Sequence, residues 1–198
     1  MAFDVEMDRC ALLILDHQQL LIDGYVKDPT AHLKKVRSLL ALTRDRMPVI
    51  HVKVAFRPEY PEISDNNKIF SAVRAGKRFL DDDPRSEIPH ELRSVKTDIV
   101  IVKHRVSAFE GTDLQLVLRA QRVETLILFG IATSGVVLST VRQAADLDYR
   151  LVVVEDLCHD NDNEIHEFLV QKILPRQAAV VTLEALAARL TAEQGCSE

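Results

Sequence analysis

Residues 125–160 have the pattern of a strand, a tight turn, a helix and a second strand, and this pattern constrains the fold of the whole chain. Residues 126–129 form a short apolar run, and residues 151–154 are apolar throughout, as expected of a strand covered on both faces. Between these runs, apolar residues recur with helical spacing from Val136 to Leu147. A strand–helix–strand unit of this kind predicts a parallel sheet and places the turn after its first strand at the carboxyl edge, where such sheets bind ligands.

The turn between the first strand and the helix, Ile131-Ala132-Thr133, is predicted to bind an anionic group together with Val136. The unpaired N–H groups at the start of a helix point outward at this edge of the sheet. Thr133 and Ser134 carry hydroxyls that could accept from these N–H groups, so we expect one of them to cap the helix.

The rest of the chain alternates between strand and helix patterns. Further strands are predicted at residues 11–15, 49–56, 98–102 and 178–181, and further helices at 31–46, 112–122, 162–174 and 183–190, with a short helix within 65–80. This alternation favours an α/β fold with a mostly parallel sheet. With 198 residues, 47% of them hydrophobic, the chain is expected to form a single domain over residues 1–198.

Composition and charge argue against several classes of function. A net charge of −5 and the lack of a long Lys/Arg run predict no nucleic-acid partner. No apolar run approaches the roughly 18–20 residues of a membrane span, and the N-terminus is acidic where a signal peptide needs basic residues. The three cysteines, Cys10, Cys158 and Cys196, are widely spaced with no C-x-x-C, so we expect a cytoplasmic protein without a disulfide framework.

Two charged residues, Asp16 and Lys103, come directly at the ends of the first and third predicted strands. Side chains at these positions project at the carboxyl edge, and a lysine ammonium beside an aspartate would stabilise or orient the carboxylate. The alternatives are an aspartate in an ordinary turn and a lysine that extends its head into solvent. Both residues are therefore candidates for catalysis, with Lys103 as the electrostatic partner of Asp16.

The segment GIATSGVV at residues 130–137, taken with Asp16, Lys103 and the pattern K-x-x-x-S-A-F-x-x-T-x-L that starts at Lys103, resembles the isochorismatase-like hydrolases, also called cysteine hydrolases. The matches extend from Ala11 to Asp156. The resemblance implies a three-layer Rossmann-like fold, with a six-stranded sheet in the order 3-2-1-4-5-6 and helices on both faces. It also implies a homo-oligomer, a cis peptide bond between Ile131 and Ala132, and no cofactor.

One position departs from the family pattern. Most relatives carry a nucleophilic cysteine six residues after the glycine of the motif, and here Val136 occupies that position. Valine has no nucleophilic atom, so an acyl-enzyme at this residue is excluded. In the isochorismatase branch the resemblance instead implies an acid role for the aspartate, which requires apolar surroundings that raise the pKa of Asp16.

Several other residues are weaker candidates. Gln18, Arg57 and Phe109 could contact a substrate, and an arginine would favour a carboxylate ligand. Cys158 follows the strand at 151–154 and could replace the missing thiol, although buried cysteines are mostly inert.

A metal site is not expected, because divalent metals need three or four converging ligands. His51 lacks the further ligands that metal-binding relatives use, and His159 and His166 are expected to belong to a solvated, acidic helix start.

Two hypotheses about function remain open at this point. The first is a metal-free hydrolase of a small, carboxylate-bearing molecule, in which Asp16 acts as acid or base with Lys103 and the turn from Ile131 to Val136 binds the anion. The second is a non-catalytic protein that binds a small molecule on the same scaffold.

Overall fold

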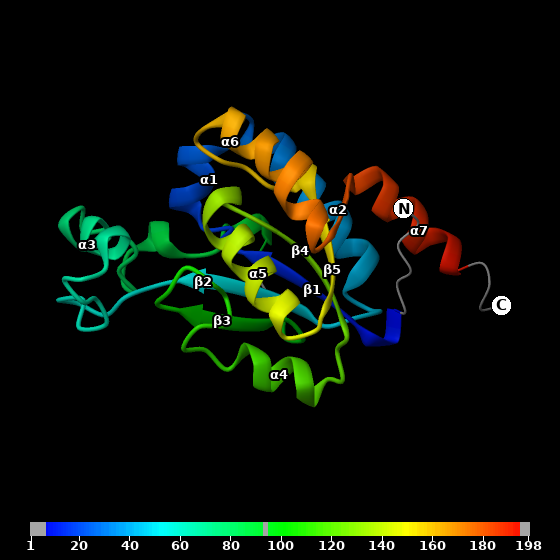
Figure 1. Cartoon of the computed structure of the whole chain (residues 1–198), viewed down its shortest axis with the longest axis horizontal. Helices are drawn as coiled ribbons and strands as arrows, with labels where there is room; N and C mark the ends of the chain where they lie inside the picture. The colour runs from blue at the N-terminus through cyan, green and yellow to red at the C-terminus, as the bar shows by residue number, and fades with distance from the viewer. Residues whose placement is uncertain (1–6, 93–94, 195–198) are drawn as a thin grey trace.

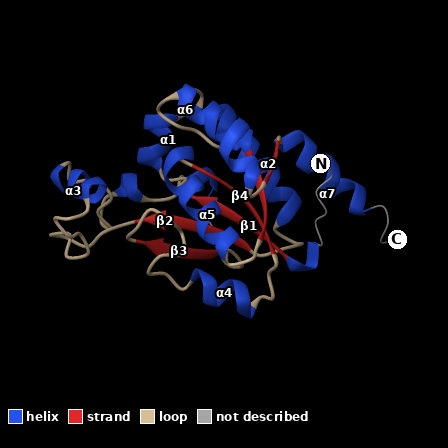
Figure 2. Ribbon diagram, in the orientation of Figure 1, coloured by secondary structure: helices blue, strands red, loops and turns tan. Residues whose placement is uncertain are grey.

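The computed structural model describes residues 7–92 and 95–194, and at its centre lies a six-stranded sheet whose strand pairings are all parallel (Figure 2). The strands are β1 (Cys10–Leu15), β2 (Val49–Val54), β3 (Ile99–Lys103), β4 (Thr125–Gly130), β5 (Arg150–Val154) and β6 (Ala179–Val181). They lie in the order β3-β2-β1-β4-β5-β6, which confirms the predicted fold class and strand order.

Helices surround this sheet (Figure 1). They are α1 (Gln19–Tyr25), α2 (Pro29–Thr43), α3 (Lys68–Ala75), α4 (Leu114–Ala120), α5 (Leu138–Asp146), α6 (Asn163–Phe168) and α7 (Leu183–Gln194). Helices α2 and α7 pack together, and α5 packs against β5. Because β4, β5 and β6 extend the sheet in one direction and β2 and β3 in the other, right-handed connections place α2 on the face opposite α5.

The two central strands, β1 and β4, form the core of the protein, and all their residues are buried. Their backbones approach closely at the carboxyl end, where Gly130 pairs with Leu15. A Cβ atom at Gly130 would lie 2.6 Å from both the Cβ and the carbonyl oxygen of Leu15, so only glycine fits there. This contact fixes the ends of β1 and β4 beside each other, and both following segments belong to the candidate site.

The α-helix α1 (Gln19–Tyr25) was not predicted from the sequence. The helix has seven residues, and its N-cap residue, Gln18, makes no side-chain capping bond. A segment this short gives too little periodic signal to be recognised. Its position matters, because it begins three residues after Asp16 and its last residue, Tyr25, reaches the cavity described below.

The start of the α5 region also differs from the prediction. A π-helical turn at Thr133–Val137 precedes α5, and its N-cap residue is Ala132, with no capping bond from a side chain. The N–H of Ser134 instead donates to Asp160 Oδ2 at 2.7 Å, and Thr133 Oγ1 lies 2.8 Å from His166 Nδ1. The prediction that Thr133 or Ser134 caps this helix is therefore wrong, since a carboxylate from a distant segment takes that role.

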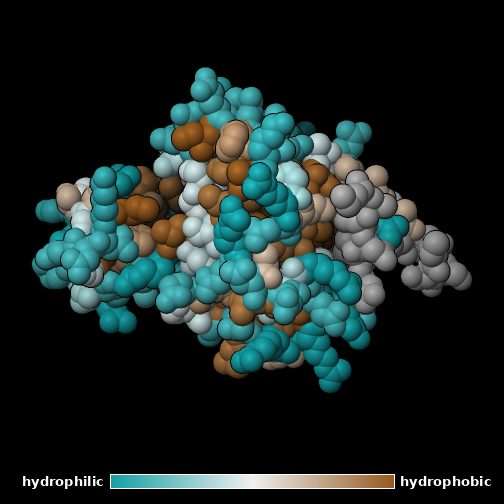
Figure 3. All heavy atoms as spheres, viewed as in Figure 1, coloured by the Kyte–Doolittle hydropathy of each residue, from teal (hydrophilic) through white to brown (hydrophobic). Residues whose placement is uncertain are grey.

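The surface is mixed in polarity, as Figure 3 shows for one face, with apolar groups near α3 and over α4 and α6. The largest exposed apolar side chains on these helices are Ile69, Leu116 and Phe168. Because they lie on three separate helices, they are typical of an ordinary protein surface. Within residues 7–92 and 95–194, no helix has the length and apolar character needed to cross a membrane.

Candidate active site

Asp16 and Lys103 meet at the carboxyl edge of the sheet, as their places at strand ends predicted. β1 and β3 flank β2 on its two sides, and the side chains at their ends come together beside it. Lys103 Nζ lies 2.8 Å from Asp16 Oδ2. Asp16 has a left-handed backbone with φ of 54°, a conformation that Asp tolerates better than most residues.

Burial dominates the electrostatics of this pair. The side chains of Lys103 and Asp16 are only 3% and 7% exposed. Burial raises the pKa of Asp16, and the charge and hydrogen bond of Lys103 offset part of this rise. Lys103 Nζ also donates to the carbonyl of Arg105 at 3.0 Å. Asp16 Oδ1 is buried and has no hydrogen-bond partner among the described residues, so it is available to a ligand or a water molecule.

A cavity of about 180 Å³ opens beside Asp16 and Lys103. Its volume lies below the roughly 300–1,000 Å³ typical of pockets for drug-sized ligands, so it suits a small molecule. Most of its wall is apolar, and this wall comes from α1, β2, α3, the loop after α3 and the turn after β4. The lining residues are Asp16, Leu21, Tyr25, Val54, Ile69, Phe70, Val73, Arg78, Phe79, Lys103, Val106, Ile131, Ala132, Gly135 and Val136.

The long segment between β2 and β3 contributes much of this wall. Phe56, Tyr60, Phe70 and Phe79 form a separate apolar cluster with neighbouring residues, apart from the main core. Phe56 is fully buried and its ring contacts that of Phe70 at a centroid distance of 5.4 Å. The segment therefore packs as a unit of its own, and part of it lines the cavity.

The turn after β4 supplies another part of the cavity wall. The peptide bond between Ile131 and Ala132 is cis, which confirms the prediction. The N–H of Thr133 donates to the carbonyl of His159, and those of Gly135 and Val137 donate to the carbonyl of Ala132. The N–H of Ala132 has no acceptor in the part of the chain that the structure describes. Ala132 is therefore the better placed donor for an anion, whereas the N–H of Thr133, predicted for the same purpose, is already occupied.

Val136 lies in the cavity wall and is 3% exposed. Val136 thus presents an isopropyl group to the cavity. This group supplies no nucleophile and occupies space beside Asp16.

Three predicted substrate contacts lie away from the cavity. The side-chain amide of Gln18 is fully buried and exchanges hydrogen bonds with Val54, donating to its carbonyl and accepting from its N–H. Phe109 is 6% exposed and belongs to the main core. Arg57 is exposed and pairs with Glu62 at 3.3 Å. None of the three lines the cavity. The amide of Gln18 is bonded to a strand, Phe109 is packed in the main core, and Arg57 forms a surface ion pair.

Arg78 takes the place that the sequence suggested for Arg57. It lines the cavity, and no ion pair joins it to any described residue. Arg78 follows α3 in a segment without periodic pattern, so its place beside the cavity could not be predicted from the sequence. Its guanidinium supplies positive charge at the mouth of a cavity that otherwise holds one aspartate and one lysine.

Cys158 and the histidines are not part of this cavity. Cys158 is 2% exposed, donates to the carbonyl of Val154 at 3.4 Å and has a pKa that burial raises to about 12. Such a thiol is not a nucleophile at neutral pH, which argues against the suggestion that it replaces the missing cysteine. His51 pairs with Asp98, and within the described ranges no three His, Cys, Asp or Glu side chains converge as metal ligands.

Comparison with known proteins identifies the family. The isochorismatase domain matches residues 10–185, so the chain belongs to the isochorismatase family of hydrolases. An uncharacterized isochorismatase family protein of Escherichia coli O157:H7, YecD, is 40% identical over 98 residues, a match that covers 50% of this chain and 52% of that protein. The chain therefore spans about half the length of this relative.

Two further comparisons concern proteins named for their reactions. Maleamate amidohydrolase of Pseudomonas putida is 28% identical over 177 residues, covering 87% of this chain and 82% of that protein. The solved structure of N-carbamoylsarcosine amidase from Thermoplasma acidophilum superposes with a TM-score of 0.71 at 27% identity, covering 88% of this chain and 96% of that one.

Proposed function

We propose that this protein hydrolyses a small, carboxylate-bearing molecule without a covalent intermediate, using Asp16 as the acid–base group and Lys103 as its electrostatic partner. The observation that carries the proposal is the buried ion pair of Asp16 and Lys103. Lys103 Nζ lies 2.8 Å from Asp16 Oδ2, and the same cavity is lined by Val136, which has no nucleophilic atom. A buried carboxylate with one unpartnered oxygen is costly to keep, and such groups concentrate at functional sites.

Water takes the role of the absent thiol in this proposal. Asp16 Oδ1 accepts a proton from a water molecule, and the oxygen of that water attacks the substrate carbon. The bond from that carbon to the leaving nitrogen or oxygen then breaks, and Asp16 returns the proton to the leaving atom. The raised pKa of Asp16 suits this exchange, because a carboxyl whose pKa moves toward neutrality both accepts and returns a proton readily.

The remaining groups hold the substrate. Lys103 stabilises the ionised form of Asp16. Ala132 lines the same cavity, and its N–H, which has no acceptor among the described residues, serves as a donor to negative charge that develops on the substrate oxygen. Arg78, an exposed arginine that lines the cavity and has no ion pair with a described residue, binds the substrate carboxylate. Maleamate, the molecule for which one relative is named, carries a carboxylate beside its amide and illustrates the class.

Val136 gives weight to the second candidate function, a non-catalytic protein that binds a small molecule. The valine fills space that a smaller residue would leave for water next to Asp16. Under this alternative the cavity retains its ligand and Asp16 serves only to bind it.

A panel of small amides and enol ethers, each with and without a carboxylate, separates the two functions. We expect the wild-type protein to hydrolyse a carboxylate-bearing member and Asp16→Asn to lose this activity. Asp98→Asn is the matched control, because Asp98 is also a buried, ion-paired carboxylate but lies outside the cavity. Binding that survives Asp16→Asn, with no turnover of any compound by the wild type, would instead establish the binding protein.

A further inference from the structure

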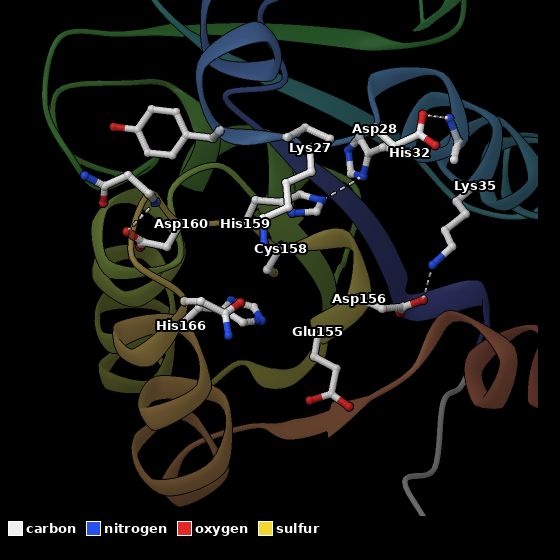
Figure 4. A pocket seen from close by; sticks show the side chains of 15 residues that line it. Lys27, Asp28, His32, Lys35, Glu155, Asp156, Cys158, His159, Asp160 and His166 are labelled. Carbon is white, nitrogen blue, oxygen red and sulfur yellow. Dashed lines mark hydrogen bonds and ion pairs between the residues drawn. The ribbon is translucent and has the colours of Figure 1, made fainter.

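A second cavity, of about 470 Å³, lies behind the turn that closes the candidate active site. Its wall comes from the end of α1, the start of α2, the 3-10 turn η5 (Glu155–Leu157) and the start of α6. Figure 4 shows His159 and Cys158 near the middle of this hollow, with His166 and Asp160 on one side and Asp156 on the other. The cavity is more polar than the first and contains neither Asp16 nor Lys103.

Three histidines from distant parts of the sequence form a hydrogen-bonded chain into this cavity. His17 Nδ1 lies 3.2 Å from the carbonyl oxygen of Leu15, and His17 Nε2 lies 2.9 Å from His32 Nε2. His32 Nδ1 in turn lies 3.0 Å from His159 Nε2. The chain thus runs from the end of β1 through α2 to His159, which lines the cavity.

The carbonyl at one end fixes the direction of every bond in this chain. A carbonyl only accepts, so His17 carries its proton on Nδ1 and presents a lone pair at Nε2. His32 must then donate from Nε2 and accept at Nδ1, and His159 must donate from Nε2. Neutral imidazoles satisfy this order, and burial lowers the pKa of all three, that of His32 to about 4. His159 Nδ1 is left as a hydrogen-bond acceptor facing the second cavity.

The charged groups of the cavity wall favour a positive ligand. The carboxylates of Asp28, Glu155, Asp156 and Asp160 outnumber the ammonium groups of Lys27 and Lys35. Three of these carboxylates already accept backbone N–H groups, Asp28 from Ala31, Asp156 from Leu183, and Asp160 from Ser134 and Asn161. Glu155 is half-buried, and its carboxylate has no partner among the residues that the structure describes.

We propose that this second cavity binds a small organic ammonium ion, whose N–H groups donate to His159 Nδ1 and whose charge is balanced by Glu155. His159 and Glu155 both line this one cavity, and no described residue forms a hydrogen bond or ion pair with His159 Nδ1 or with the Glu155 carboxylate. A donor-rich cation satisfies both, whereas an anion satisfies neither.

The ligand site shares its wall with the candidate active site. His159 accepts the N–H of Thr133 through its carbonyl, Asp160 accepts the N–H of Ser134, and His166 Nδ1 contacts Thr133 Oγ1. Tyr25 lines both cavities. A cation in the second cavity therefore contacts residues that hold the turn from Ile131 to Val136.

Isothermal titration calorimetry at low ionic strength with 1,4-diaminobutane tests the proposal. The neutral 1,4-butanediol and the dianion succinate are matched in length and serve as controls. We expect saturable binding of the diamine at one site, with each control at least about tenfold weaker. Failure of the diamine to bind, or equal binding of the diol, would overturn the proposal.

Two variants locate the site. Glu155→Gln removes the free carboxylate and is expected to weaken diamine binding by about fivefold. Glu164→Gln makes the same change of charge on the exposed first turn of α6, away from the cavity wall, and is expected to change binding by less than about twofold. Equal losses in the two variants would contradict a site at Glu155.

His159→Gln tests the acceptor separately. A glutamine amide can still donate to His32 Nδ1, but it leaves no acceptor where Nδ1 of His159 stood, so diamine binding should weaken by about fivefold. Hydrogen exchange gives a readout that does not depend on any variant. Diamine should slow exchange at the N–H groups of Thr133 and Ser134, and unchanged exchange there with saturable binding would place the ligand elsewhere.

Discussion

The two cavities on either side of the turn at Ile131–Val136 are built from different parts of the sequence. Comparing them shows which site residues can be predicted from their positions at strand ends and which cannot. The first cavity is apolar and contains a buried ion pair whose members, Asp16 and Lys103, stand at the ends of β1 and β3. The second is polar, and two of its lining residues, His32 and His159, belong to a hydrogen-bonded chain of three histidines that come from the end of β1, from α2 and from the loop after η5. Sequence order located the ion pair but gave no sign of the histidine chain.

The largest effect that distinguishes the cavities is expected from Lys103→Met. The change leaves the carboxylate of Asp16 buried without its partner, and breaking a buried pair in this way costs about 3–5 kcal/mol. Lys53→Met is the matched control, because Lys53 pairs with Glu87, whose side chain is 53% exposed, and should cost under about 1 kcal/mol. Urea unfolding measures both, and equal losses would show that burial of the Asp16–Lys103 pair is not important for stability.

Acid should weaken the protein through the histidines behind the turn. Histidines in the unfolded chain titrate near 6.5, whereas burial lowers the pKa of His17 and His32 in the folded protein, that of His32 to about 4. Below pH 6.5 these histidines therefore bind protons in the unfolded chain but remain neutral in the folded protein. The free energy of unfolding should fall by up to about 1.4 kcal/mol per pH unit for each of these two histidines as the pH drops from 6.5 toward 4.

The variant His32→Gln isolates this effect. The stability of this variant should depend less steeply on pH between 6.5 and 4, by about one bound proton. Urea midpoints across this pH range give the slopes. An unchanged slope in His32→Gln would mean that His32 accepts a proton in the folded protein.

Arg78→Gln should affect substrate binding more than turnover. Loss of the guanidinium removes the proposed contact with the substrate carboxylate, so we expect KM to rise about tenfold with little change in kcat, while Arg57→Gln changes neither. Steady-state kinetics on a carboxylate-bearing amide and its neutral analogue check this. An equal rise in KM for the neutral analogue would show that Arg78 does not bind the substrate carboxylate.

Cys158→Ala should have the smallest effect on catalysis. The thiol is buried in the wall of the second cavity, and its raised pKa keeps it protonated. We expect unchanged turnover and a loss of about 1 kcal/mol of stability from the smaller side chain. A large loss of turnover in a folded Cys158→Ala protein would contradict this expectation and indicate that Cys158 is the nucleophile.

Sequence reasoning succeeded where the fold itself fixes the position of a side chain. A residue at the end of a parallel strand lies at the carboxyl edge wherever the strand stands in the sheet, so Asp16 and Lys103 could be placed without knowing their neighbours. Strand order required the family resemblance as well.

It failed where position depends on packing between distant segments. Arg78 lies in a non-periodic stretch next to Phe79, which packs in a cluster with Phe56 and Phe70. Arg57 was predicted as a substrate contact because it follows the second predicted strand directly. His159 and His166 were expected on a solvated helix start. Instead His159 bonds to His32 and His166 contacts Thr133, which are 127 and 33 residues away in the sequence.

The most direct test of the account is the pH dependence of kcat/KM for the best carboxylate-bearing substrate, measured on the wild type and on Asp16→Asn. If Asp16 is the base, kcat/KM of the wild type falls as the pH drops through the pKa of Asp16, which burial places above 3.8. Asp16→Asn should be slower by a factor of about 10²–10⁴ and lack this acid limb. A folded Asp16→Asn protein that keeps the wild-type rate and the same acid limb would contradict the central claim.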